Sequence, residues 1–144
     1  MGKIVIKALC LIENDGKLLL CKGYDSVKKE TFFMIIGGTV NFGEKTEEAL
    51  RREMREEVNS EIENLKFLTV VENIFTYEGK NEHEICFIYK GDLSNKEVYK
   101  KEYIKINEEG LPAEWVPISD ILAGEIRFYP EFSHYQELFS PIFK

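Results

Sequence analysis

Hydrophobic and polar positions alternate with a period of two residues over several stretches, a pattern that predicts β-strands. Strands are expected at residues 4–12, 17–21, 32–36, 65–77, 83–89 and 97–107. The turn residues Asn-Asp-Gly at 14–16 predict a hairpin between the first two strands. A second hairpin is expected across Glu-Gly-Lys-Asn at residues 78–81.

A period of about 3.6 residues marks the expected helices, most clearly over residues 46–58. The apolar stripe of this helix consists of Ala49, Leu50, Met54 and Val58. Shorter helices are predicted at residues 118–123 and 131–139, which follow Pro117 and Pro130. Strands with helices on two sides predict an α/β fold, an α/β/α sandwich around a mixed β-sheet.

Two carboxylates interrupt the apolar stripe of the helix at 46–58. Glu53 and Glu57 are four residues apart, carry like charge and have no basic residue three or four positions away on their own side. Such a pair destabilises a helix unless a cation lies between the two groups. With Glu56 at the border of the same face, the oxygen density suits Mg²⁺ or Mn²⁺.

A solvated charged face is the alternative interpretation, and it fits part of the helix. Pairs of opposite charge four residues apart occur at Glu47 and Arg51, Glu48 and Arg52, and Arg52 and Glu56. This interpretation leaves Glu53 and Glu57 unexplained.

Paired glycines precede the helix, at the end of the strand predicted over residues 32–36. Gly37 and Gly38 allow the backbone to approach a ligand closely or to adopt a positive φ. The free N–H groups at the start of the following helix favour an anion at the same place. A plain turn is the alternative, but together with the carboxylates the glycines predict a metal-bridged phosphate.

The segment 38–60 resembles the Nudix box, Gly-x5-Glu-x7-Arg-Glu-U-x-Glu-Glu-x-Gly-U, where U is a bulky aliphatic residue. Seven positions match at the correct spacing: Gly38, Glu44, Arg52, Glu53, Met54, Glu56 and Glu57. Asn59 replaces the last glycine, and Ser60 replaces the last aliphatic residue. Asn59 is still expected to end the helix in the left-handed conformation, and Ile62 to take the apolar role of Ser60. The resemblance implies one domain of Nudix fold over residues 1–144.

The resemblance also implies a divalent-metal-dependent hydrolase. Its substrate would be a nucleoside diphosphate linked to another moiety, such as a nucleotide, a nucleotide sugar or a dinucleoside polyphosphate, cleaved at a phosphoanhydride bond. Glu53, Glu56 and Glu57 would hold Mg²⁺ or Mn²⁺, and Glu53 would also orient or deprotonate water. Arg52 would hold the ligand set by pairing with Glu56 or Glu44, and Glu44 would complete the catalytic group. Candidates for a separate general base are Glu102, Glu108, Glu109 and Glu114.

Tyr77 lies 17 residues after the box, where Nudix enzymes acting on diadenosine polyphosphates tend to place a base-stacking tyrosine. The resemblance therefore suggests a substrate-binding role for Tyr77, although a single aromatic residue in a strand usually serves packing. Glu84 is either a further metal ligand or a solvent-facing strand residue. A core or a dimer contact is expected for the aromatic residues near the end of the chain, Phe128, Tyr129, Phe132, Tyr135 and Phe139.

Charge and cysteine content narrow the class of protein. The formal net charge of −7 disfavours a nucleic-acid polymer as partner and is compatible with a small phosphorylated substrate escorted by a cation. Cys10, Cys21 and Cys86 are odd in number and form no C-x-x-C pair, so buried free thiols in a reducing compartment are expected. Without a long apolar run or a signal peptide, a cytoplasmic protein with no membrane partner is predicted, and a homodimer is compatible with these features.

Two other functions remain open from the sequence. A non-catalytic Nudix-fold module that senses a nucleotide is the main alternative, but such modules often lose box glutamates and this chain retains all of them. Isomerase chemistry on a prenyl diphosphate is more remote, because it requires an additional cysteine and acid outside the box. Cys86 is the cysteine best placed for that role, and its apolar neighbours predict a core position instead.

Overall fold

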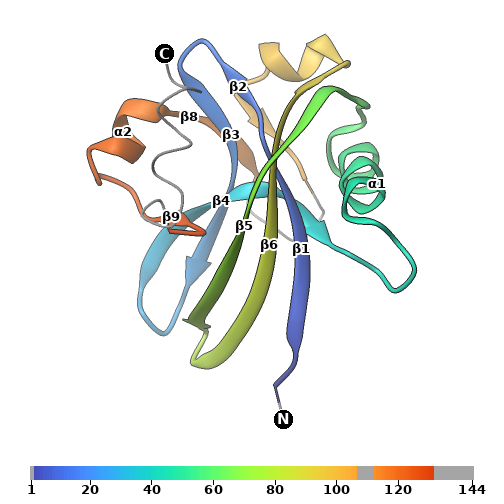
Figure 1. Cartoon of the computed structure of the whole chain (residues 1–144). Coiled ribbons are helices and arrows are strands. Elements are labelled where there is room, and N and C mark those ends of the chain that lie inside the picture. The colour runs from blue at the N-terminus through green and yellow to red at the C-terminus, as the bar shows by residue number, and fades with distance from the viewer. Residues whose placement is uncertain (1, 107–111, 132–144) are drawn as a thin grey trace.

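A mixed β-sheet forms the centre of the computed structural model, which describes residues 2–106 and 112–131 (Figure 1). Its strands in the described residues are β1 (Ile4–Leu11), β2 (Glu13–Asn14), β3 (Lys17–Asp25), β4 (Glu30–Thr39), β5 (Ile62–Tyr77), β6 (Lys80–Leu93), β7 (Tyr103–Ile104), β8 (Ala113–Pro117) and β9 (Phe128–Tyr129). The main order is β5-β6-β1-β4-β3-β8-β7, with β2 on β3 and β9 on β4. β1 runs parallel to β6 and β9 runs parallel to β4, whereas the other pairs are antiparallel.

Helices lie on both sides of this sheet, as Figure 1 shows for α1 (Thr46–Val58) and α2 (Ile118–Leu122). Because side chains alternate along β1, Ala8 and Cys10 pack in the core formed with α1, whereas Leu9 and Leu11 pack in the core formed with α2. The predicted α/β/α arrangement around a mixed sheet is confirmed. Within the described ranges, no helix combines the length and the apolar character needed to cross a membrane.

The strands expected before residue 90 are present, and the two predicted hairpins are tight turns. Asp15 and Gly16 have φ values of 51° and 76°, and Glu78 and Gly79 have values of 52° and 76°. Such left-handed pairs join antiparallel strands through two residues. The second hairpin is tighter than predicted, so β6 begins at Lys80.

One prediction after residue 95 is wrong, and one strand there was not predicted. The segment predicted as a strand over 97–107 contains a 3₁₀ helix, η1 (Lys96–Lys100), and the two-residue strand β7. Asn95 starts η1 because its side chain accepts a hydrogen bond from the backbone N–H of Glu97 at 3.2 Å. Strand β8 was not predicted, since the residues around Trp115 were interpreted only as the approach to a helix. The helix expected at 131–139 lies almost entirely outside the described residues.

Helix α1 has the predicted bounds and ends as predicted. Asn59 follows it in the left-handed conformation, with φ 51° and ψ 49°. Ser60 is buried, and its hydroxyl accepts a hydrogen bond from the backbone N–H of Asn95 at 3.0 Å. Ile62 is buried in the core beside α1, as expected of the residue that replaces the missing aliphatic position. The segment after α1 therefore accommodates a buried serine, because the Ser60 hydroxyl group is hydrogen bonded.

The three cysteines are free thiols. Cys10 and Cys86 are buried and Cys21 is half-buried, which confirms the expectation for two of the three. Burial raises the pKa of Cys21 and of Cys86 to about 12, so these thiols stay protonated near neutral pH. Cys86 packs in the core with Leu9 and Ile88, as the sequence predicted.

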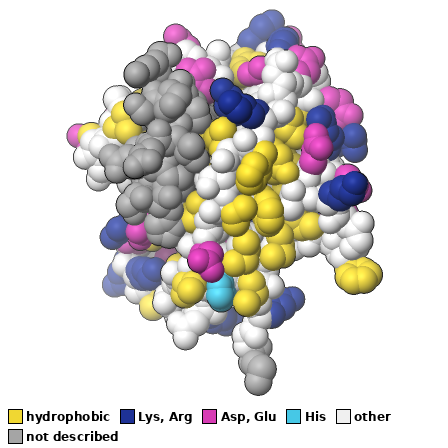
Figure 2. Space-filling model, viewed as in Figure 1, with side chains coloured by type: hydrophobic (Ala, Val, Ile, Leu, Met, Phe, Trp, Pro, Cys, Tyr) yellow, Lys and Arg dark blue, Asp and Glu magenta, His cyan; other side chains and the backbone are white. Residues whose placement is uncertain are grey.

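Exposed hydrophobic side chains lie along β5 and the start of β1. Phe67, Val70 and Ile74 of β5 and Ile4 of β1 are each more than two-fifths exposed. Figure 2 shows hydrophobic side chains in a band along the middle of this face of the molecule. Contiguous exposed apolar surface of this kind is typical of interaction sites. The homodimer stays a prediction, and no partner chain identifies what covers the band.

Candidate active site

Arg52 of α1 lies at the centre of a carboxylate network. Its Nε donates to Glu44 Oε2 at 2.7 Å, and its Nη2 donates to Glu44 Oε1 at 3.0 Å. Its Nη1 donates to Glu53 Oε1 at 2.8 Å and to Glu56 Oε2 at 3.3 Å, and Nη2 also reaches the carbonyl oxygen of Thr39 at 3.0 Å. The predicted pairing of Arg52 with Glu44 or Glu56 is confirmed for both residues.

The network corrects one expectation about Glu53. No basic residue lies three or four positions from Glu53, so no partner was expected for it, yet Arg52, its immediate neighbour in the chain, pairs with it. Hydrogen bonds from Arg52 also lower the pKa of Glu44, and the backbone N–H of Asn41 adds to this effect. Glu44 and Glu53 are therefore held as oriented carboxylates by one guanidinium group.

Glu57 has a different environment one turn after Glu53. Its carboxyl group is half-buried, and burial, followed by the charge of Glu53 and a hydrogen bond with it, raises the pKa of Glu57 to about 8. Its Oε2 is buried without a hydrogen-bond partner in the described part of the chain. The raised pKa favours the protonated form of Glu57 near neutral pH when no cation is bound.

These residues fit a divalent ion, although they are not arranged around one. As the side chains stand, no three His, Cys, Asp or Glu residues within 2–106 and 112–131 converge in positions that coordinate a cation. The unpartnered oxygen of Glu57 beside Glu53 offers the hard oxygen ligands that Mg²⁺ and Mn²⁺ prefer. Glu56 is exposed and can turn toward them. Ligation by Glu53, Glu56 and Glu57 stays a prediction.

Gly37 and Gly38 lie inside β4, where they pair with Leu9 and Ala8 of β1, rather than after the strand as predicted. Gly37 has a φ of 153°, and a Cβ there would lie 2.1 Å from the carbonyl oxygen of Ala8. A Cβ at Gly38 would lie 2.3 Å from the carboxyl carbon of Glu53. One glycine therefore permits the strand pairing, and the other leaves room for the Glu53 carboxylate.

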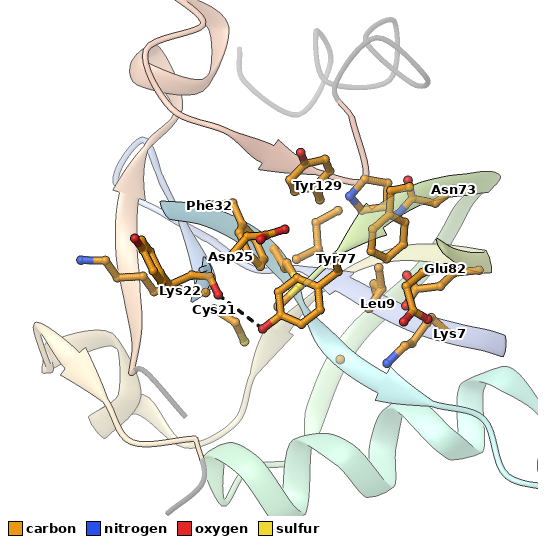
Figure 3. Close-up of a pocket in the computed structure, with 18 of the residues that line it drawn as sticks. Lys7, Leu9, Cys21, Lys22, Asp25, Phe32, Asn73, Tyr77, Glu82 and Tyr129 are labelled. Atoms are coloured by element: carbon orange, nitrogen blue, oxygen red, sulfur yellow. Dashed lines mark hydrogen bonds between the residues drawn. The ribbon is translucent and has the colours of Figure 1, made fainter. Parts of the chain in front are cut away.

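A cavity of about 590 Å³ adjoins the glycines and Glu57 (Figure 3). Tyr77 lines it, and its ring packs edge-on against Phe32 with centroids 5.9 Å apart. Tyr129 also lines the cavity, and its ring is stacked with that of Phe75 at 6.3 Å. The volume is within the range of about 300–1,000 Å³ typical of small-molecule sites.

Comparison with known proteins identifies the family of this chain. The sequence profile described as NUDIX domain matches residues 3–135. This chain belongs to the Nudix hydrolase family. It is 37% identical over 119 residues to a protein named nucleoside triphosphatase NudI from Escherichia coli O17:K52:H18, a match that covers 78% of this chain and 81% of that protein. Hydrolases of this family generally use a divalent metal ion.

Solved structures show the same fold. A NUDIX hydrolase from Nitrosomonas europaea superposes with a TM-score of 0.69 at 18% identity, covering 96% of this chain and 90% of that one. A MutT NUDIX hydrolase from Burkholderia pseudomallei superposes with a TM-score of 0.62 at 22% identity, covering 82% of this chain and 86% of that one. These superpositions show that the present chain has the Nudix fold.

Several cavity residues of this Nudix hydrolase were not predicted from its sequence. They include three lysines, a buried aspartate and a buried asparagine: Lys7, Lys22, Lys28, Asp25 and Asn73. Each lies in or beside a strand, where alternation predicts the face of the sheet but not the cavity that the face encloses. No local pattern in the sequence marks these five residues as neighbours.

The other predicted candidates have mixed outcomes in this Nudix hydrolase. Glu84 lines the cavity and accepts a hydrogen bond from the Cys86 thiol at 3.8 Å, and its role as a further metal ligand stays a prediction. Phe128 is buried as expected, whereas Tyr129 belongs to the cavity wall rather than only to a core or dimer contact. Glu102 is exposed, and neither it nor Glu114 lines the cavity. Outside the described residues lie Glu108, Glu109, Phe132, Tyr135 and Phe139.

Asp25 joins two turns beside the cavity through hydrogen bonds to its carboxylate, and it is 2% exposed. Its Oδ1 accepts hydrogen bonds at 3.0 Å from the backbone N–H groups of Val27 and Lys28, and its Oδ2 accepts one at 3.2 Å from that of Glu78. The bond from Lys28 is the main cause of the lowered pKa of Asp25. Glu78 in turn accepts hydrogen bonds from the N–H and the hydroxyl of Ser26. One carboxylate thus joins the β3–β4 and β5–β6 turns.

Proposed function

We propose that this Nudix hydrolase uses Mg²⁺ or Mn²⁺ to cleave a phosphoanhydride bond in a nucleoside diphosphate linked to another moiety. The name of the NudI relative favours nucleoside triphosphates as the first substrates to test. The observation that carries the proposal is the buried, unpartnered oxygen of Glu57, which lies beside Glu53 and in the wall of the cavity. A hard cation would replace the proton that Glu57 otherwise retains.

Glu53, Glu56 and Glu57 would hold the ion. When bound, the ion would neutralise charge on the leaving phosphate and lower the pKa of water. Glu53 would orient this water or accept its proton, a role that its hydrogen bond from Arg52 supports by fixing the carboxylate. Arg52 would act as a positioning residue, since it fixes Glu53 and Glu44 together.

Lysines of the cavity would bind the phosphates. Lys7 and Lys22 line the same space as Glu57, and Lys28 lies at its rim, where its Nζ donates to the carbonyl oxygen of Thr76 at 2.6 Å. The same lining carries five carboxylates, Asp25, Glu30, Glu57, Glu82 and Glu84, so a small anionic substrate would bind there together with a cation as well as the lysines. Gly37, Gly38 and Tyr77, which also line the cavity, would contact that substrate.

The test is cleavage of nucleoside triphosphates, nucleotide sugars, ADP-ribose and dinucleoside polyphosphates, measured as released phosphate with coupling enzymes. Each substrate is offered with Mg²⁺ and with Mn²⁺ to the wild type, to Glu57→Gln and to Glu48→Gln. Glu48 is exposed in the first turn of the same helix and provides the matched control. We expect Glu57→Gln to lose roughly 100-fold or more in kcat with its fold intact, because a ligand is lost, and Glu48→Gln to match the wild type.

Two results would contradict the proposal. Equal turnover by the wild type and Glu57→Gln would remove Glu57 from the site. Nucleotide binding without any cleavage by the wild type would instead support the non-catalytic sensing module.

A further inference from the structure

Asn73 of β5 is a buried polar residue that the proposed chemistry does not use. It is 5% exposed and lines the cavity (Figure 3). Within the described residues its carboxamide makes no hydrogen bond, although Glu84 lies directly opposite on β6. The buried polar atoms without a partner in the described residues belong to Glu57, His83 and Trp115, so the amide atoms of Asn73 are not enclosed and can be reached from the cavity. The amide is therefore free of protein partners and open to a molecule that occupies the cavity.

Flat aromatic groups surround this carboxamide. Phe75 and Tyr77 follow Asn73 at intervals of two along β5, and all three line the cavity. Tyr129 stacks with Phe75 at an interplanar angle of 28°. Aromatic faces beside a group with one donor and one acceptor function are the features that bind a nucleobase, by stacking and by hydrogen bonds to its edge.

We propose that Asn73 determines specificity by hydrogen bonding to the edge of the substrate's base, an inference that rests on the proposed nucleotide hydrolase. The carboxamide offers an N–H donor beside a C=O acceptor, which matches any base edge with an adjoining acceptor and donor. No hydrogen bond from the described residues fixes the carboxamide, so it can rotate by half a turn. It can then match a base edge with the donor and the acceptor in either order. Asn73 therefore selects for the presence of such a donor and acceptor pair rather than for one base.

The experiment measures binding separately from cleavage. Calorimetry with Mg²⁺ determines Kd for non-hydrolysable α,β-imido triphosphates in two matched pairs. One pair is adenosine and purine riboside, and the other is cytidine and 2-pyrimidinone riboside; in each pair the second base lacks the exocyclic amino group. The variants are Asn73→Leu, which keeps the volume and removes the amide, and Asn81→Leu as control, since Asn81 is exposed on β6 and does not line the cavity.

We expect the wild type and Asn81→Leu to bind the complete base of at least one pair about tenfold more tightly than its stripped counterpart. Asn73→Leu should bind both members of that pair equally. Its Tm should be unchanged or higher, since the amide bonds no group of the described residues and leucine keeps the volume of the side chain. A structural role would instead lower the Tm and weaken both members alike.

The failures are distinguishable. The same preference in the wild type and Asn73→Leu, no preference in the wild type, or no binding of any analogue would each overturn the role of Asn73. A wild type that shows the preference but cleaves none of the corresponding natural nucleotides would overturn the proposed hydrolase and retain the base contact.

Discussion

Gly37 and Gly38 are adjacent in β4, yet an added methyl group would have different effects at the two positions. At Gly38 it would displace the carboxylate of Glu53, the mobile end of a side chain, whereas at Gly37 it would collide with the backbone of Ala8. We expect Gly38→Ala to fold and to lose roughly 100-fold in kcat, because a misplaced carboxylate orients water poorly. Gly37→Ala should lower the free energy of unfolding by about 1–3 kcal/mol, since its φ also disfavours a side chain.

Urea unfolding and kcat measured on both variants check this contrast. Gly2→Ala is the control, because a Cβ at Gly2 would meet no atom within 4 Å. Full activity in Gly38→Ala would show that the position of Glu53 in the structure is not the one that catalysis requires.

Arg52 provides a second prediction at the scale of single residues. Lysine keeps the charge but lacks the planar fork that contacts Glu44 through two nitrogens while also reaching Glu53. Arg52→Lys should therefore reduce kcat by about tenfold or more with a smaller change in KM. Steady-state kinetics test this, with Arg55→Lys as control because Arg55 is exposed and pairs with Glu61 away from the cavity. A change confined to KM would assign Arg52 to substrate binding instead.

The sequence predicted the box residues well for a physical reason. Spacing along a helix determines which side chains share a face, so Glu53 and Glu57 were expected one turn apart, as they are. The contact between Arg52 and Glu53 was not expected, because it depends on how a long side chain bends around Glu44. The raised pKa of Glu57 depends on burial by other elements and has no local signal.

At the scale of elements, a prediction concerns the end of α1, where Asn59 replaces the last glycine of the Nudix box. Asn59 adopts a left-handed conformation that branched side chains resist. Asn59→Val should lower the free energy of unfolding by about 1–2 kcal/mol, whereas Asn59→Gly should change it little. Thermal unfolding followed by circular dichroism checks both. Equal stability of the two variants would mean that the chain past α1 relaxes without cost.

Elements with a strong period were predicted closely, and those controlled by side-chain capping were not. Helix α1 has the expected bounds because apolar residues recur at helical spacing from Ala49 to Val58, and Asn59 ends it in the left-handed conformation. The alternation after residue 96 predicted a strand, but the side chain of Asn95 starts a 3₁₀ helix there. Strand β8 is short, and it forms by pairing with β3. No local pattern in the sequence indicates this pairing.

At the scale of the whole molecule, Glu57 predicts how stability depends on pH without metal. Its pKa of about 8 in the folded state lies above the ordinary value of 4.5. The folded protein thus binds more protons than the unfolded one between these values, so the free energy of unfolding falls as pH rises toward 8. Urea unfolding in EDTA between pH 5.5 and 8.5 should show this fall in the wild type.

Glu57→Gln separates this effect from other titrations, since its stability should fall less over the same range. Mg²⁺ should raise the Tm of the wild type more at pH 8.5 than at pH 5.5, because it binds the deprotonated carboxylate. Identical pH profiles for the two proteins would mean that Glu57 has an ordinary pKa when folded.

The cavity is a feature of the whole molecule, and the sequence did not predict it. Its wall combines Lys7 of β1, Asn73 of β5 and Tyr129 of β9, which are distant in the chain and meet only through the order of the strands. Local patterns identify strands and their faces, but they do not state which strands become neighbours.

The buried carboxylate of Asp25 has a consequence for engineering the enzyme. Turns at the tips of hairpins normally accept inserted peptides and new chain ends without harm. Here the tips between β3 and β4 and between β5 and β6 share one acceptor, because Val27, Lys28 and Glu78 all donate to it. We expect an insertion in either tip to weaken the hydrogen bonds that join the two tips. Fusion partners and affinity tags are therefore better placed at the turn of Asp15 and Gly16, which lies outside this shared contact.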